Sequence, residues 1–125
     1  MRARLKTANT ILYCQHWQDM VRFYRDRMGL CVLFANDWFV EFILTPTSRL
    51  SIADQRRASV KSCAGQGLTL ALEVEDLRAA HRFAENAGLT PTPMRKHPWN
   101  AEVFYLTDPE GHRVEIWQAM NETAQ

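Results

Sequence analysis

The sequence contains two copies of one structural unit. A strand-like segment at Thr10 to Cys14 is followed by a helical segment that ends at Gly29-Leu30. The same order returns where Leu68 to Val74 precedes a helical segment ending at Gly88-Leu89, with the two Gly-Leu pairs 59 residues apart. Two copies of one supersecondary unit can pair around a shared cavity, with matching positions of each pointing into one site. The repeat therefore predicts two modules and a cavity.

The first module is predicted to have the order βαβββ. After the first strand, apolar side chains recur at three- and four-residue spacing, which indicates an amphipathic helix, and Gly29 suits its left-handed end. Three short strands separated by turn residues are expected next, at Cys31 to Ala35, Phe39 to Leu44 and Leu50 to Ala53. The segment that follows, about residues 55–66, has almost no large apolar side chain and is predicted to be a linker.

The second module repeats this order. Asp76 stands where a helix N-cap is expected, and Gly88 can close that helix. Residues Thr90 to Pro98 include three prolines, which cannot donate to a strand ladder, so this strand is expected to be irregular or at an edge. An apolar strand at Val103 to Leu106, an Asp-Pro-Glu-Gly turn and a last strand at His112 to Gln118 complete the module.

Composition limits the functional classes. A chain of 125 residues with 46% hydrophobic residues is one soluble domain by size, and its net charge of +1 gives no long-range field for nucleic acid or acidic lipid. No window approaches the roughly 20 apolar residues of a membrane span, and no secretion signal is visible. We expect a cytoplasmic protein with no nucleic-acid or membrane partner, in which Cys14 and Cys31 are reduced core residues of strands.

Strand parity separates the side chains into two faces, because residues two apart on a strand share a face. In the last strand Val114 and Ile116 suit a covering helix, while Arg113, Glu115 and Trp117 lie opposite. We therefore expect an α+β fold in which each module is a curved mixed sheet with a helix on one face, together forming a cup-shaped cavity. A solvated sheet face with incidental aromatic residues is the alternative. The same parity places on the cavity side Tyr13, Ser51, Thr69 and Glu73.

Three passages resemble the glyoxalase, bleomycin-resistance and ring-cleaving dioxygenase superfamily, also called the vicinal oxygen chelate fold. They are Val21 to Leu30, similar to the family's Phe-Tyr helix end, Leu72 to Leu77, and Phe104 to Trp117 with its terminal Glu. The resemblance runs from about Asn9 to Trp117. It implies one domain over residues 1–125, with module one at about 8–54 and module two at about 67–118, and a homodimer whose cups are often completed across subunits.

Enzymes of this family typically hold a divalent metal with histidine and glutamate ligands. Carried onto this sequence, the last-strand ligand matches Glu115, while the other positions fall on Asn9, Ser51 and Thr69. These neutral side chains are not usual ligands of a catalytic transition metal. No cofactor is therefore expected, although Glu115 offers a carboxylate for a weakly bound, hydrated Mg²⁺ or Ca²⁺.

The non-metal branch of the family consists of small dimeric proteins that sequester an antibiotic or another planar ligand. Four tryptophans and three tyrosines suit a cavity that stacks a flat or cationic compound, with a glutamate as counter-charge. The first hypothesis is a metal-free, homodimeric binding protein of the antibiotic-resistance type. Its candidate ligand-binding residues are Tyr13, Trp38, Ser51, Thr69, Glu73, His97, Trp99, Tyr105, Arg113, Glu115 and Trp117.

Two alternatives stay open. One is an enzyme of the same superfamily, a lyase, isomerase or dioxygenase, with a degenerate metal site or with Glu115 or Glu73 as general base. Tyr13, Tyr105 or His97 would then be the proton partner. The other is a partner-binding domain whose cup is filled by its own side chains. Of the four histidines only His97 is expected near the cavity, and a surface role is its alternative.

Overall fold

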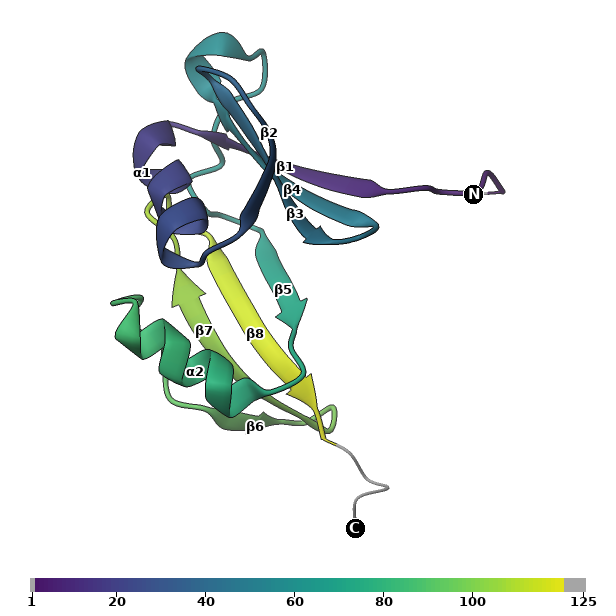
Figure 1. The fold of residues 1–125 in the computed structure, drawn as a ribbon, viewed down its shortest axis with the longest axis vertical. Helices are drawn as coiled ribbons and strands as arrows, with labels where there is room; N and C mark the ends of the chain where they lie inside the picture. The colour runs from purple at the N-terminus through teal and green to yellow at the C-terminus, as the bar shows by residue number, and fades with distance from the viewer. Residues whose placement is uncertain (1, 121–125) are drawn as a thin grey trace. The chain divides into compact units, whose positions relative to one another are not determined.

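The computed structural model describes residues 2–120. The chain divides into two compact units, Met1–Ala64 and Gly65–Gln125, and the division lies inside the segment predicted to be a linker. Each unit is a four-stranded mixed sheet with a helix on one face, as Figure 1 shows. The α+β fold of two βαβββ modules is therefore confirmed. No helix within residues 2–120 is long and apolar enough to span a membrane.

The sheet of the first unit has the strand order β1-β4-β3-β2, in which β1 runs parallel to β4 and the other pairs are antiparallel. Its helix was predicted as one continuous segment, but it widens into a π-helical turn where the Met28 amide donates to the Phe23 carbonyl at 2.9 Å. The elements are β1 (Ala8–Cys14), α1 (Trp17–Arg22), the π turn η1 (Phe23–Arg27), β2 (Cys31–Ala35), β3 (Phe39–Thr45), β4 (Ser48–Asp54) and the short 3₁₀ turn η2 (Gln55–Arg57).

The core of the first unit lies between α1, η1 and the sheet. Tyr24 and Phe42 are fully buried, and the rings of Phe23 and Tyr24 meet edge to face with centroids 4.9 Å apart. Trp17 packs on the sheet, and its Nε1 donates to the Ile52 carbonyl at 2.8 Å. This bond anchors the start of α1 on β4.

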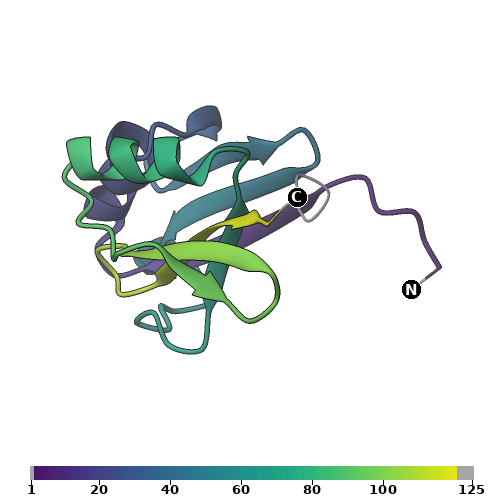
Figure 2. The same ribbon diagram turned by 90° about the horizontal axis from the view of Figure 1, so that it is seen from below.

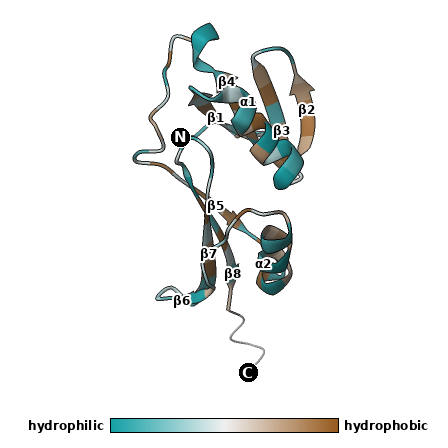
Figure 3. Cartoon of the chain, turned by 90° about the vertical axis from the view of Figure 1, so that its left-hand side faces the viewer, coloured by the Kyte–Doolittle hydropathy of each residue, from teal (hydrophilic) through white to brown (hydrophobic). Residues whose placement is uncertain are grey.

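Cys31 is exposed, so the prediction that it is a core residue is wrong. It lies on β2, which is an edge strand, and every residue of β2 is exposed. A register shift between Val32 and Phe34 further loosens its pairing with β3. The apolar sequence of β2, drawn brown in Figure 3, led to the error, because apolar character alone does not reveal an edge. Cys14, in contrast, is fully buried as predicted.

The sheet of the second unit has the equivalent order β5-β8-β7-β6, with β5 parallel to β8. Its helix begins as predicted, because the Asp76 side chain accepts from the Ala79 amide at 3.1 Å. Figures 1 and 2 show this helix on one face of the sheet, and the short strand that forms within the proline-containing segment Thr90 to Pro98 lies at the edge, as predicted. The elements are β5 (Thr69–Glu73), α2 (Leu77–Asn86), β6 (Arg95–His97), β7 (Ala101–Thr107) and β8 (Arg113–Ala119).

The turn before β8 fixes the faces of that strand. The buried Asp108 carboxylate accepts from the amides of Glu110 and His112 at 3.0 and 2.9 Å, and His112 Nδ1 lies 3.0 Å from its Oδ2. His112 is therefore held inside the unit, on the side away from Glu115, as parity predicts. Because the turn is fixed, β8 cannot shift by one residue, and each of its side chains is assigned to one face of the sheet.

Candidate ligand-binding site

The face of the second sheet that α2 leaves uncovered carries the site; we call it the open face. Val114 and Ile116 are buried on the helix side, so Glu115 and Trp117 project from the opposite side. Glu115 stands between Ala71 of β5 and Tyr105 of β7, and Trp117 stands between Glu73 and Val103. Parity therefore places a carboxylate and an indole as neighbours on one face.

A hollow of about 260 Å³ opens on this face, and we call it the Trp117 hollow. Ala101 and Val103 form a buried apolar floor, with 7% and 3% of their surfaces exposed. Trp99 is 82% exposed and stands at the rim. The full lining is His97, Trp99, Ala101, Val103, Glu115 and Trp117.

The β6–β7 turn holds the rim of the Trp117 hollow. Asn100 adopts a left-handed conformation with a φ of 65°, which asparagine tolerates better than most residues. Its carbonyl accepts from the Met120 amide at 2.8 Å, tying the turn to the end of β8. The His97 and Trp99 rings lie side by side, with centroids 6.4 Å apart and an interplanar angle of 35°. The rim is therefore aromatic on one side and ordered by backbone contacts.

The Glu115 carboxylate is available to a ligand. It is partly exposed, and within residues 2–120 no hydrogen bond or ion pair engages it. A carboxylate that shares a wall with an indole and stands beside an apolar floor favours a ligand that is flat and positively charged.

A guanidinium lies beside the hollow on the same open face. Arg113 Nε donates to Thr69 Oγ1 at 3.1 Å, and its Cζ lies 4.9 Å from the centroid of the Tyr105 ring. We call these three residues the Arg113 cradle. Thr69 and Tyr105 contact the guanidinium on two sides, which favours one orientation of its planar group.

A family model for the Glyoxalase/Bleomycin resistance protein/Dioxygenase superfamily matches residues 6–116. The chain belongs to this superfamily. Among curated proteins, none matches the sequence significantly. Solved structures share the glyoxalase-superfamily fold with it at low identity.

A crystal structure of a glyoxalase/bleomycin resistance protein/dioxygenase from Nocardioides has a TM-score of 0.78 at 20% identity, covering 98% of this chain and 88% of that chain. The crystal structure of lactoylglutathione lyase from Agrobacterium tumefaciens has a TM-score of 0.72 at 18% identity, and the match covers 94% of both chains. A glyoxalase/bleomycin resistance protein from Streptomyces sp. CB03234 gives 0.70 at 16%, covering 88% of this chain and 97% of that chain. At such identities the likeness shows the fold alone.

The glyoxalase-superfamily positions for metal ligands do not fit a transition metal in this chain. In the first unit, Ser51 is fully buried and its hydroxyl donates to Asn9 Oδ1 at 2.8 Å. In the second unit, the Thr69 hydroxyl is engaged by the positively charged Arg113, which would repel a cation. No group of three or more His, Cys, Asp or Glu gathers anywhere in residues 2–120 in a way that can hold an ion. We therefore derive no chemistry through a metal at these positions.

The structure brings some of the predicted site residues together and separates others. His97, Trp99, Glu115 and Trp117 line the Trp117 hollow. Thr69, Glu73, Tyr105 and Arg113 share its face without lining it. Tyr13, Trp38 and Ser51 belong to the first unit, where the Trp38 ring lies 5.5 Å from that of Phe39. The floor residues Ala101 and Val103 were missed, because small apolar side chains in a strand equally suit a core.

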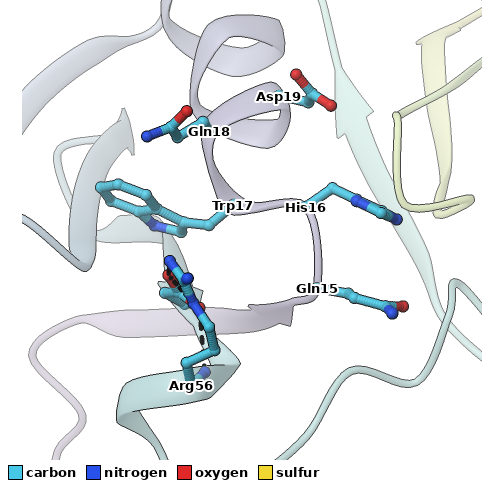
Figure 4. A pocket seen from close by; sticks show the side chains of 7 residues that line it. Gln15, His16, Trp17, Gln18, Asp19 and Arg56 are labelled. Carbon is cyan, nitrogen blue, oxygen red and sulfur yellow. Dashed lines mark hydrogen bonds and ion pairs between the residues drawn. The ribbon is translucent and has the colours of Figure 1, made fainter.

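A second hollow of about 260 Å³ lies in the first unit, at the junction of β1 and α1. Figure 4 shows the Trp17 indole above the Arg56 guanidinium, with Gln15 and His16 on the other side. Its lining is polar, and Arg56 Nη2 lies 2.7 Å from Asp54 Oδ2. The side-chain hydrogen bond from Arg56 lowers the pKa of the buried Asp54 carboxyl. Because these charges neutralise each other, this hollow offers a ligand less than the Trp117 hollow does.

Proposed function

We propose that this glyoxalase-superfamily protein binds and sequesters a flat, cationic small molecule in the Trp117 hollow, without a metal ion. The observation that carries the proposal is the Glu115 carboxylate, unpaired within residues 2–120, in one wall with Trp117 and beside a buried apolar floor. An indole face attracts a cation by about 0.5–2 kcal/mol, depending on how far the cation is desolvated. The carboxylate adds a counter-charge at the same place.

The proposal includes a homodimer. The family resemblance implies that cups are completed across subunits, and the open face of the second unit leaves Trp99 82% exposed at its rim. A second copy of the chain would enclose a ligand that one open face leaves partly in water. Sedimentation velocity with and without ligand measures this, and a species of one chain under both conditions would contradict it.

Calorimetric titration of the wild-type protein tests the binding function. The flat cation 1-methylquinolinium is compared with 2-methylnaphthalene, which has a similar shape and no charge. We expect the cation to bind at one site per chain and at least about tenfold more tightly, because only the cation uses both Trp117 and Glu115. Equal affinity for the two compounds, or no binding of either, would refute the proposal.

A second candidate function is proton abstraction next to a carbonyl group, as in an isomerase or lyase. It is favoured by one observation, namely that Tyr105 is the direct cross-strand neighbour of Glu115. A carboxylate base and a phenol would then share one substrate. Hydrogen–deuterium exchange at the carbon beside the carbonyl, measured over a panel of aromatic ketones, tests it. Exchange that survives Glu115→Gln would rule out this role.

A further inference from the structure

We propose that the Arg113 cradle is a carboxylate-binding subsite next to the Trp117 hollow, so that the ligand is a zwitterion with a flat cationic part and a carboxylate. This inference rests on the proposed function, because it extends the same ligand along the same strand. The inference specifies the chemical class of the ligand, which the Trp117 hollow alone does not determine.

The guanidinium is ordered before a ligand binds. Thr69 Oγ1 takes the Nε hydrogen at 3.1 Å, and the Tyr105 ring supports the plane at 4.9 Å. A free arginine side chain loses rotamer entropy when it is fixed, and these two contacts reduce the number of orientations that a ligand would have to remove. The edge of the guanidinium that carries Nη1 and Nη2 is left for a ligand, and its geometry matches the two oxygens of a carboxylate.

The positive charge of Arg113 has no acidic partner among the described residues. Glu115 lies two residues further along the same face of β8, yet no ion pair joins Arg113 to an acidic residue within residues 2–120. The contact with Tyr105 accounts for this, because the guanidinium lies over the ring of the residue that pairs with Glu115. Two opposite charges are therefore held apart on one face, each open to a ligand.

Arg49 of the first unit shows what a purely structural arginine looks like at the equivalent position. Arg49 pairs in register with Asn9, as Arg113 pairs with Thr69. However, Arg49 Nη1 donates to the Thr45, Pro46 and Ser48 carbonyls at 2.9 to 3.2 Å. Its Nε also lies 3.7 Å from Glu41 Oε2. Arg49 thus holds a turn together, whereas the Nη edge of Arg113 has no such use within residues 2–120.

The spacing of the two residues along β8 bounds the size of the ligand. The Cα atoms of residues two apart on a strand are separated by about 6.6 Å. A ligand whose ring lies on Trp117 near Glu115 therefore reaches Arg113 with a carboxylate on a short, flexible chain. A carboxylate attached directly to the ring would be too close, and one on a long chain would lose the benefit to chain entropy.

The test uses two series of probes in calorimetric titration. One series carries a carboxylate at the end of an alkyl chain of one to six methylenes on the quinolinium nitrogen. The other series has plain alkyl chains of the same lengths. We expect the carboxylate to improve affinity for the wild-type protein by about fivefold at an intermediate length, because the ion pair is partly exposed to water. Arg113→Gln is expected to abolish that gain without weakening the binding of the plain series, because removal of a positive charge does not disfavour a cation.

Lys96→Gln is the matched control, because it removes the same charge from β6 on the other face of the sheet, where Lys96 pairs with Glu102. It is expected to retain the gain, which separates the subsite from a change in net charge. Circular dichroism establishes that each variant is folded.

The outcomes distinguish this inference from the proposed function. If the plain cations bind but the carboxylate brings no gain, or a gain that survives Arg113→Gln, the subsite is refuted and the binding function stands. If neither series binds, both proposals fail. Carboxylate-dependent binding that needs Arg113 but is unaffected by Glu115→Gln would uphold the anion subsite and refute the role of Glu115 as counter-charge.

Discussion

In each unit, the face of the sheet that lies away from the helix is built on the same register, but the two faces carry different side chains. Ser51 and Ala53 of β4 occupy the positions that Glu115 and Trp117 occupy on β8. In the first unit both residues are fully buried, although they lie on the side away from the helix. In the second unit the equivalent residues border the Trp117 hollow. Repetition of a fold therefore does not repeat a site.

The size of two side chains accounts for much of this difference. The small residues at positions 51 and 53 put little side chain above the strand, and the Ser51 hydroxyl is satisfied by Asn9. Large residues at 115 and 117 stand up from the sheet and frame a space over Ala101 and Val103. The first unit thus has a face that is closed over Ser51 and Ala53, whereas the second has an open one, and each prediction below tests one side of that contrast.

The largest expected effect is on the closed face. Ala53→Leu adds volume where no exposed surface remains, so we expect the free energy of unfolding to fall by about 1–3 kcal/mol. Urea denaturation monitored by circular dichroism measures it. Trp117→Leu, at the equivalent position of the open face, is the comparison and should cost less. Equal costs for both substitutions would show that the two faces do not differ in packing.

The next largest effect should follow from removal of the Trp117 indole, and it concerns ligand affinity and not stability. Trp117→Ala removes one aromatic wall of the hollow, so the affinity for 1-methylquinolinium should fall by about tenfold, or ~1.4 kcal/mol. Trp17→Phe is the control, because Trp17 packs on β4 in the first unit. Unchanged affinity in Trp117→Ala would place the ligand elsewhere.

A smaller effect concerns acid stability, which we assign to the first unit. Arg56 lowers the pKa of Asp54, so this pair stabilises the folded state above the ordinary carboxyl pKa of about 4 and the contribution is lost as the pH falls through the lowered value. We expect less than about 1 kcal/mol, because the Arg56 side chain is 83% exposed.

Comparison of Asp54→Asn with the wild type between pH 7 and pH 3 tests this assignment. The variant should be the less stable protein at pH 7, and the difference between the two should shrink as the pH falls. A difference that grows on acidification would contradict the assignment.

The sequence predicted most of the fold because its local signals agree with each other. The Asp76 cap, the helix-ending glycines and the turn at Asp108 place the elements within a few residues of their observed bounds. Strand parity then places Glu115 and Trp117 on one face from the alternation of side chains alone. These features depend on neighbouring residues, which a sequence displays directly.

What the sequence did not predict depends on contacts between distant residues. Cys31 is exposed because β2 is an edge strand, and the sequence of a single strand does not show its position in the sheet. Ser51 is buried with its hydroxyl bonded to Asn9 of another strand, and Val103 is the floor of a hollow that His97 and Trp117 of other strands help to line. The polar hollow beside Trp17 joins residues 15–19 to 54 and 56 and left no signal in either segment.

The most direct test of the account is whether the Glu115 carboxylate selects a cation. Glu115→Gln keeps the shape of the side chain and removes its charge, and Glu102→Gln does the same on the other face of β7, where Glu102 pairs with Gln118. In calorimetric titration with 1-methylquinolinium, we predict a loss of about fivefold in affinity for the first variant and no loss for the second. Equal affinities for wild type and Glu115→Gln would contradict the account.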